Sequence, residues 1–250
     1  MPIIQNFYEL NEATIKYYQT LIIGDEGKVA TDFLCDLHIS EETIARFRLG
    51  YTGTSERGLT NHLNSLGYSN DQIIEAGLAR MDENDETKDV FQNRLIIPII
   101  DDENRVIGFS GRSLENVSPI YLNSRSTDVF DKSKNLFGLN IAKDASADYM
   151  ILCEGFTDVI SLSQAGFDMA TATLGVEFTA DQANLLKKYT SKVLVCFDSD
   201  DIGNKGADSA IGILVENGIK GLKIDLSPFK DPMDMITKEG ADAFRERLGL

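Results

Sequence analysis

Two apolar runs that end in acidic residues, YMILCEG at 149–155 and KVLVCFDSD at 192–200, decide the fold of the C-terminal part of the chain. Short apolar runs of this kind are typical of strands that are buried on both faces. Helical patterns follow them at Asp158–Gln164 and Ala207–Glu216. Strands and helices that alternate at this spacing predict βαβ units and an α/β fold with a mainly parallel sheet.

Working outward from these runs, two more strands are predicted at Met169–Leu174 and Leu222–Leu226. Thr179 is followed three residues later by Gln182, which is the spacing of a capping box at the start of another helix. Gly218 stands just beyond the predicted end of the helix 207–216, where a C′ glycine is expected.

The N-terminal part has a different character and is predicted to be a mixed α+β lobe. Apolar residues at helical spacing predict an amphipathic helix over Ile4–Ile22, and Ser69 with Gln72 predicts a capping box. The runs Leu95–Ile100 and Arg105–Phe109 are separated by a polar tetrapeptide and predict a hairpin.

Carboxylates follow three of the predicted parallel strands. Glu154 comes directly after the first run, Asp198 and Asp200 after the second, and Asp231 and Asp234 a few residues after the last. Ligands of open parallel sheets bind beyond the carboxyl ends of the strands, so these acids are expected to converge there. Clustered carboxylates repel one another unless a cation neutralises them, and Mg²⁺ is the natural cation. A purely structural use of each acid as a turn former or helix cap is the alternative.

The composition sets limits on the function. The formal net charge of −16 is unusual for a protein that binds nucleic acid, but Phe91–Lys143 holds seven basic and six acidic residues. A nucleic-acid path is therefore expected over that segment. Cys35 and His38 have the spacing of metal ligands, yet a second pair that would complete a zinc site is missing from the sequence. The absence of a signal-like or membrane-spanning run predicts a cytoplasmic protein that does not enter a membrane.

The sequence also resembles a known family, the bacterial DnaG-type DNA primases. Glu154–Val159 is similar to the EGYxDV motif of the primase Toprim domain, Asp198–Asp200 to its DxD motif, and Lys230–Asp234 to its DPD region. Upstream motifs in family order are Phe91–Ile99, Val106–Arg112, Tyr121–Ser124 and Phe130–Lys132. Within the Toprim part, Ala172–Gly175 resembles the A-x-LG motif that follows the second strand. The Toprim motifs alone are shared with topoisomerases and some nucleases, whereas the upstream motifs are specific to primases.

The resemblance implies a role for each matching residue. Glu154, Asp198 and Asp200 would be catalytic and would hold Mg²⁺ (or Mn²⁺), with Asp231 and Asp234 extending the metal site. The residues that would contact template, primer or nucleotide are Arg94, Arg112, Asn123, Arg125 and Lys132. Arg125 is included because Ile120 stands where the family usually has a lysine, and Asp234 because Met233 replaces the second acid of the DPD region.

The resemblance further implies a Toprim domain at 147–250, preceded by an N-terminal primase-core lobe at 1–146 with a groove for nucleic acid and nucleotide. The implied function is template-directed synthesis of short RNA primers on single-stranded DNA, by metal-dependent transfer from ribonucleoside triphosphates. A Toprim nuclease and a catalytically weak single-stranded DNA-binding module are the alternatives. The family's zinc-binding and helicase-binding domains are not visible, so the chain is expected to be an excised core or a small primase of a phage or mobile element. A replicative helicase would then be a partner only through parts that this chain lacks.

Overall fold

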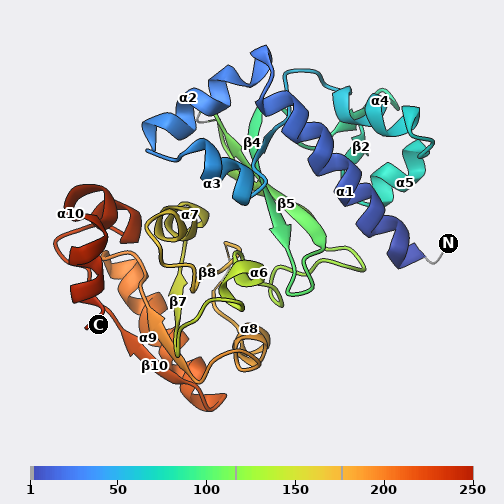
Figure 1. Cartoon of the computed structure of the whole chain (residues 1–250). Helices are drawn as coiled ribbons and strands as arrows, with labels where there is room; N and C mark the ends of the chain where they lie inside the picture. The colour runs from blue at the N-terminus through green and yellow to red at the C-terminus, as the bar shows by residue number, and fades with distance from the viewer. Residues whose placement is uncertain (1–2, 116, 176, 250) are drawn as a thin grey trace. The chain divides into compact units, whose positions relative to one another are not determined.

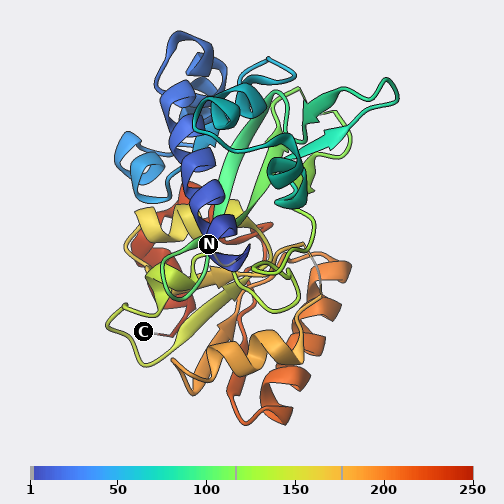
Figure 2. The ribbon, with the colours of Figure 1, turned by 90° about the vertical axis from the view of Figure 1, so that its right-hand side faces the viewer.

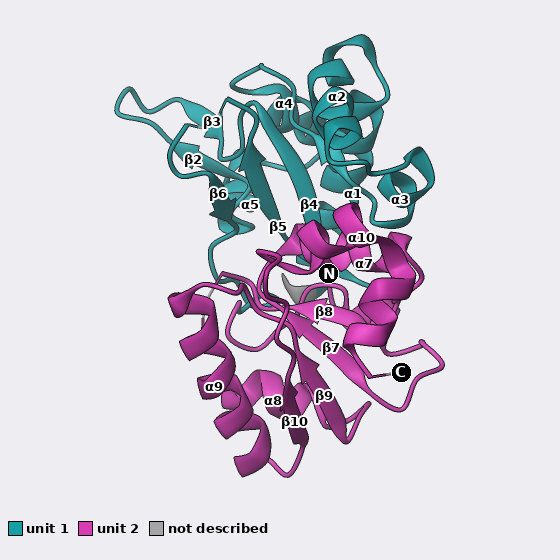
Figure 3. Cartoon of the chain, turned by 90° about the vertical axis from the view of Figure 1, so that its left-hand side faces the viewer, with its two compact units in different colours: residues 1–99, 105–131 teal, residues 100–104, 132–250 magenta. Residues whose placement is uncertain are grey.

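The computed structural model describes residues 3–115, 117–175 and 177–249 and divides into two compact units (Figure 3). The first unit comprises residues 1–99 and 105–131, and the second comprises residues 100–104 and 132–250. Within the described ranges, no helix has both the length and the apolar character that crossing a membrane requires.

The first unit contains a four-stranded sheet in the order β1-β4-β5-β6 and a separate pair of strands, β2 and β3. Strand β1 is antiparallel to β4, and β5 is antiparallel to β6. Figure 2 shows the β2–β3 hairpin projecting from the rest of this unit. Its elements are α1 (Ile3–Ile22), η1 (Asp25–Gly27), α2 (Lys28–Asp36), α3 (Glu41–Arg46), β1 (Gly50–Tyr51), α4 (Gly58–Ser65), α5 (Asn70–Glu75), β2 (Ala79–Met81), β3 (Thr87–Asp89), β4 (Arg94–Ile100), β5 (Val106–Ser113) and β6 (Tyr121–Asn123).

Helix α1 supplies much of the core of this unit. Its apolar stripe buries Leu10, Ile15 and Tyr18 completely, and the ring of Tyr18 packs edge-on against Phe109 of β5. Asn11, a buried polar residue in the same stripe, donates a hydrogen bond from Nδ2 to the carbonyl of Val106 at 3.1 Å. That bond satisfies the amide where burial would otherwise cost stability, and it ties α1 to β5.

The second unit is an α/β domain with a four-stranded sheet in the order β10-β9-β7-β8. All three strand pairs in it are parallel, as the alternating pattern predicts. Its elements are α6 (Leu139–Ala142), β7 (Met150–Cys153), α7 (Phe156–Gln164), β8 (Ala170–Ala172), α8 (Ala180–Leu186), β9 (Lys192–Val195), α9 (Asp201–Glu216), β10 (Lys220–Lys223) and α10 (Pro232–Arg247).

Helices cover both faces of this sheet, with α8 and α9 on one side and α7 and α10 on the other (Figures 1 and 3). Side chains alternate along each strand, so Met150 and Leu152 of β7 join the core beneath α8 and α9 while Ile151 points to the other face. Burial of both faces explains why β7 and β9 are continuous apolar runs. The arrangement brings the carboxyl ends of β7 and β9 together at one edge.

Most of the expected elements are confirmed, including the capping boxes at Ser69 and Thr179. The last strand is a correction, because β10 is Lys220–Lys223 and not Leu222–Leu226. An edge strand has one unpaired side, so it need not be apolar, and its lysines are a common protection for such an edge. Leu226, which suggested a later strand, is buried, but it lies beyond the end of β10.

Helix α4 depends on a carboxylate from another element. Its N-cap residue is Arg57, whose side chain makes no capping hydrogen bond. Asp89, at the end of β3, accepts hydrogen bonds from the backbone N–H groups of Leu59 at 2.8 Å and Thr60 at 2.9 Å. The side chain of Asp89 is buried and so links the β2–β3 hairpin to the start of α4.

We predict that Asp89→Ala lowers the free energy of unfolding by about 2 kcal/mol, because two buried N–H groups at a helix start lose their acceptor. Urea denaturation measures the change. Asp71→Ala, which removes an exposed acid from the first turn of α5, is the control and should change the same quantity by less than about 0.5 kcal/mol. Equal effects of the two substitutions would contradict the assigned role of Asp89.

Candidate active site

The centre of the candidate site is a contact between the ends of two parallel strands. Glu154 directly follows β7, and its Oε1 accepts a hydrogen bond from the backbone N–H of Asp198 at 3.0 Å. Asp198 lies three residues beyond the end of β9, and both side chains are partly buried. The structure therefore brings Glu154 and Asp198 together at the carboxyl edge of the sheet.

Gly203 makes this close approach possible. A Cβ atom added at Gly203 would lie 2.2 Å from the carbonyl oxygen of Asp198 and 2.8 Å from Oε1 of Glu154. Real Cβ atoms do not approach other atoms that closely, so any side chain at position 203 would displace the first turn of α9 or the Glu154 carboxylate. The glycine is thus a structural requirement of the site.

Asp200 and Asp231 begin helices at the same edge. Oδ1 of Asp200 accepts hydrogen bonds from the backbone N–H groups of Ile202 and Gly203 and so caps α9. Oδ1 of Asp231 accepts a hydrogen bond from the N–H of Asp234 at 2.7 Å and caps α10. Capping therefore engages one oxygen of each carboxylate. Both acids thus serve in part as helix caps, and each has a second oxygen that does not take part in the capping.

Lys230 forms ion pairs with two acids of this group. Its Nζ lies 3.0 Å from Oδ2 of Asp231 and 3.7 Å from Oδ2 of Asp198. Its carbonyl oxygen also accepts a hydrogen bond from the N–H of Ser199 at 2.7 Å, which joins the loop before α10 to the loop before α9. Lys230 thus partly neutralises two acids that lie on different loops.

The electrostatics of the site reflect crowded negative charge. Partial burial raises the pKa of Glu154, and the carboxylates of Asp198 and Asp200 raise it further, while the hydrogen bond from the N–H of Asp198 opposes the rise. Partial burial also raises the pKa of Asp198, which Lys230 lowers and Asp231 raises. A divalent cation at this edge would favour the ionised form of each acid.

Asp158 connects α7 to the start of α10 from beneath the site. It is almost completely buried, and it accepts hydrogen bonds from the backbone N–H of Gly155 at 3.2 Å and of Met233 at 3.3 Å. Burial raises the pKa of Asp158 to about 8, and the nearby charge of Asp231 contributes in the same direction. The hydrogen bond from Met233 ties α7 to the loop that carries Asp231, and the one from Gly155 caps the start of α7.

Asp234 has different partners. Its carboxylate pairs with Lys238 at 2.8 Å and accepts a hydrogen bond from the N–H of Lys230 at 3.1 Å. Among the residues that the structure describes, no three acids, histidines or cysteines are arranged as a ready set of metal ligands. Glu154, Asp198 and Asp231 nevertheless supply the oxygen donors that Mg²⁺ and Mn²⁺ take, so the chemistry of the donor set fits such an ion.

The basic residues proposed for nucleic acid have varied surroundings. Nη1 of Arg94 donates to the carbonyl oxygens of Gly111 at 2.9 Å, Pro119 at 3.0 Å and Ile120 at 3.1 Å. A side chain at Gly111 would collide with Arg94 Cδ, so the glycine leaves room for the arginine to cross β5. Arg94 therefore anchors the segment that leads into β6.

The other four residues lie in both units. The guanidinium of Arg112 stacks 4.0 Å above the ring of Phe33. Asn123 of β6 lies opposite Ser110 of β5, so its side chain is on the same face of the two strands as Arg112. Nη2 of Arg125 donates to the carbonyl oxygens of Ile74 and Glu75 at the end of α5. The side chain of Lys132 is exposed in the second unit, and its carbonyl oxygen accepts a hydrogen bond from Gln182.

Three residues of the site were given no role in the sequence interpretation. Lys230, Asp158 and Gly203 all fall inside or beside the quoted motifs, but their spacing alone says nothing of what they contact. A lysine directly before an Asp-Pro pair and a glycine three residues after Asp200 are signals too common to stand out. Only the meeting of three loops at one edge reveals their roles.

Comparison with known proteins agrees with this architecture. The family model of the DNA primase catalytic core, N-terminal domain, matches residues 17–143, and a Toprim-like model matches residues 151–236. The DNA primase of Clostridium acetobutylicum is 39% identical over 238 residues, which cover 95% of this chain and 39% of that protein. The chain thus spans about two fifths of the length of the curated relatives it matches.

Two solved structures extend the likeness to the fold. The Aquifex aeolicus primase, with its zinc-binding and RNA polymerase domains, superposes with a TM-score of 0.92 at 32% identity, covering 100% of this chain and 62% of that chain. A DnaG primase catalytic domain bound to single-stranded DNA gives a TM-score of 0.90 at 32% identity, covering 99% of this chain and 81% of that chain. The fold and the acidic edge thus define a Toprim-type α/β domain that follows a mixed α/β region along the chain. The chain belongs to the family of bacterial DNA primase catalytic cores.

We predict that Lys230→Met increases the stabilisation that Mg²⁺ gives to the protein, because the carboxylates lose their internal cation and repel one another until metal binds. Thermal melts with Mg²⁺ and with a chelator measure this difference. Lys238→Met, which removes the partner of Asp234, is the control and should leave the difference at its wild-type value. A smaller metal-induced rise in Tm for Lys230→Met would contradict the role given to Lys230.

Asp158 generates a prediction about pH. Its pKa is about 8 in the folded protein and about 4 in the unfolded chain, so between those values the folded state holds one more proton. The free energy of unfolding should therefore fall as pH rises through this window, by up to about 1.4 kcal/mol per pH unit.

Asp158→Asn removes this titration, so the difference in stability between wild type and variant should shift in favour of the variant as the pH rises from about 4 to about 8. Urea denaturation in metal-free buffer at several pH values gives the comparison. Asp181→Asn, at an exposed acid in the first turn of α8, serves as control. If the stability curves of wild type and Asp158→Asn ran parallel over the window, the raised pKa would be refuted.

Proposed function

We propose that the chain is the catalytic part of a DNA primase, which synthesises short RNA primers on single-stranded DNA by metal-dependent nucleotidyl transfer. The observation that carries the proposal is the hydrogen bond from the N–H of Asp198 to Glu154, because it joins two acids from separate strands at the edge where parallel sheets bind ligands. Family membership supports the same activity.

The acids at the edge have distinct proposed roles. Glu154, Asp198 and Asp200 would hold Mg²⁺ or Mn²⁺ and act at the chemical step, with Asp231 at the border of the metal site. Asp234, which is paired with Lys238, would act mainly by positioning the loop of Lys230 and Asp231. A bound divalent cation would supply positive charge for the triphosphate and would favour the ionised form of an attacking hydroxyl.

The substrates and partners are likewise proposals. The primase catalytic domain that resembles this chain was solved with single-stranded DNA, which supports a single-stranded template here. Ribonucleoside triphosphates would be the second substrate, and a replicative helicase would dock through parts outside this chain. The functional division at 1–146 and 147–250, and a cytoplasmic location, belong to the same proposal.

The basic residues would guide the template and the nucleotides. The guanidinium of Arg112 is held by Phe33, which orients a planar donor suited to phosphate oxygens. Asn123 lies on the same face of β5 and β6, and Lys132 is exposed. Arg94 and Arg125 would contribute through the backbone segments that they hold in place.

A catalytically weak binding module is the second candidate. Two observations favour it: Lys230 already neutralises part of the acidic edge, and the described carboxylates are not arranged as a ready set of metal ligands. The Toprim nuclease alternative is disfavoured because relatives named DNA primase match nearly the whole chain. Incubation with mixed single-stranded templates and ribonucleotides, with Mg²⁺ and Mn²⁺ compared, separates the three, because only a primase makes RNA and only a nuclease shortens the DNA.

We predict that Glu154→Gln reduces primer synthesis at least about 100-fold, because the variant loses a negative charge at the chemical centre while its amide oxygen can still accept the N–H of Asp198. Gel analysis of labelled RNA products gives the rates, and thermal melts check that the fold is retained. Glu216→Gln, at an exposed acid at the end of α9, should synthesise at the wild-type rate. Primer synthesis by Glu154→Gln at the wild-type rate would overturn the role of Glu154.

A further inference from the structure

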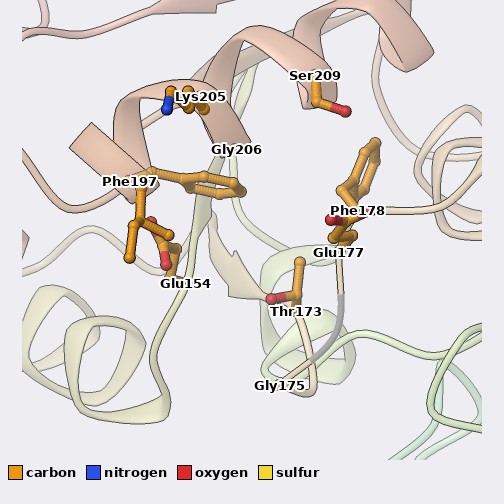
Figure 4. Close-up of a pocket in the computed structure, with 10 residues that line it drawn as sticks. Glu154, Thr173, Gly175, Glu177, Phe178, Phe197, Lys205, Gly206 and Ser209 are labelled. Atoms are coloured by element: carbon orange, nitrogen blue, oxygen red, sulfur yellow. The ribbon is translucent and has the colours of Figure 1, made fainter. Parts of the chain in front are cut away.

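Two hollows in the structure differ in their setting. The hollow beside Glu154, shown in Figure 4, borders the candidate active site and belongs to the second unit. A larger hollow, the α2–α3 groove, lies wholly within the first unit, between the end of α1 and the helices α2 and α3 (Figure 1). Its lining residues all fall between Gln19 and Leu49, so the proposed primer synthesis gives it no role.

Two short helices form the walls of the α2–α3 groove. Each helix presents one face to it, because the lining residues recur at intervals of three or four positions. They include Lys28, Thr31, Asp32 and Cys35 on α2 and Glu41 and Ile44 on α3. The floor is apolar, since Ile22, Ile39 and Leu49 line the groove and each is less than one-tenth exposed. A partner helix laid between such walls can bury an apolar face of its own.

An exposed isoleucine extends the apolar surface. Ile23 directly follows α1, lines the α2–α3 groove and is 85% exposed. Single exposed apolar residues are common on protein surfaces, but this one stands beside an apolar floor. The groove has a volume of about 1020 Å³. Small-molecule sites are typically roughly 300–1,000 Å³, so this size suits a peptide segment better than a small ligand.

The rim of the α2–α3 groove is acidic. Asp25, Asp32 and Glu41 line it, and Lys28, the basic lining residue, pairs with Asp32 at 2.9 Å. Asp25 and Glu41 therefore set the sign of the remaining charge. The surrounding segment 23–45 holds six acidic residues and one lysine. A surface of this sign attracts basic groups and repels phosphates, so it favours a cationic partner over nucleic acid or an anionic lipid surface.

We propose that the α2–α3 groove is a docking site for a cationic amphipathic helix of a partner protein. The apolar face of that helix lies against Ile23, Ile44 and the floor, and its lysines or arginines lie beside Asp25 and Glu41. A second copy of this chain is a poor occupant, because each copy carries a formal net charge of −16. The inference goes beyond the proposed function and does not depend on it, because no residue of the candidate active site lies within 19–49.

Synthetic peptides test the groove in the whole chain. The probe repeats leucine and lysine at helical spacing and carries one tryptophan on its apolar face, whose fluorescence has no protein background because the chain contains no tryptophan. The controls are its shuffled sequence, which keeps the charge but has no apolar face, and the same pattern with glutamate for lysine. The probe should bind at least about tenfold more tightly than either control, since it alone matches both floor and rim. Equal binding of the shuffled peptide would overturn the proposal.

Cys35 reports whether the peptide binds in the groove. It is exposed and lines the groove, whereas Cys153 and Cys196 are buried. Saturating probe peptide should slow the reaction of the Cys35 thiol with a chromogenic disulfide at least about fivefold, because a covered thiol reacts slowly. An unchanged rate would place the peptide elsewhere and overturn the proposal. Protection that rises with protein concentration alone would identify a second copy as the occupant and would also overturn it.

Helix α3 offers a matched pair of charge variants. Glu41 and Glu42 are neighbouring exposed acids in its first turn, and of the two it is Glu41 that lines the groove. Glu41→Lys should weaken binding of the probe peptide at least about tenfold, whereas Glu42→Lys, with the same change in net charge, should weaken it less than about threefold. Equal effects of the two substitutions would show attraction by overall charge and would overturn the assignment of the groove.

A second matched pair tests the apolar contact. Ile23→Ser should weaken binding of the probe peptide at least about fivefold, because the peptide's apolar face loses an aliphatic partner. Leu66→Ser removes another exposed aliphatic side chain of the first unit, one outside the groove, and should bind as wild type does. Thermal melts check that both variants fold. Unchanged binding by Ile23→Ser would overturn the proposed docking mode.

Discussion

The repulsion between carboxylates at the end of a buried parallel sheet is the constraint on which the C-terminal unit depends. Glu154 and Asp198 are held together by a backbone hydrogen bond, although partial burial raises the pKa of both, and neighbouring aspartates raise the pKa of each further. The chain offsets this cost locally, with helix starts at Asp200 and Asp231 and the ammonium group of Lys230. A site that stores unfavourable charge in this way has an inherent affinity for cations.

The fold provides the rigidity that such a site needs. Parallel strands buried on both faces fix where β7 and β9 end, and Gly203 allows α9 to start against the Glu154 carboxylate. Asp158 then ties the loop before α10 to the start of α7. Three loops that are far apart in the sequence are thereby held at one edge by hydrogen bonds from backbone N–H groups. Backbone groups vary less in position than side chains do, so these bonds hold the edge firmly.

Much of this architecture could be predicted from the sequence because its signals are local. Apolar runs that end in acids gave β7 and β9, and the spacings at Ser69 and Thr179 gave two capping boxes. The predicted bounds of β10 were wrong because this edge strand lacks the apolar pattern that marks a buried strand. The anchoring role of Arg94 and the position of Lys230 could not be predicted, since they depend on which carbonyl or carboxylate another segment brings within reach.

The central claim is that acids from separate strands share one divalent cation, and anomalous diffraction from crystals soaked in Mn²⁺ tests it most directly. The account predicts one strong Mn²⁺ peak within direct coordination distance of the carboxylate oxygens of Glu154 and of Asp198 or Asp200, with the Lys230 ammonium moved away from Asp198. Crystals that hold Mn²⁺ only at other surface acids, or in which Lys230 keeps its place while this edge stays free of metal, would contradict it.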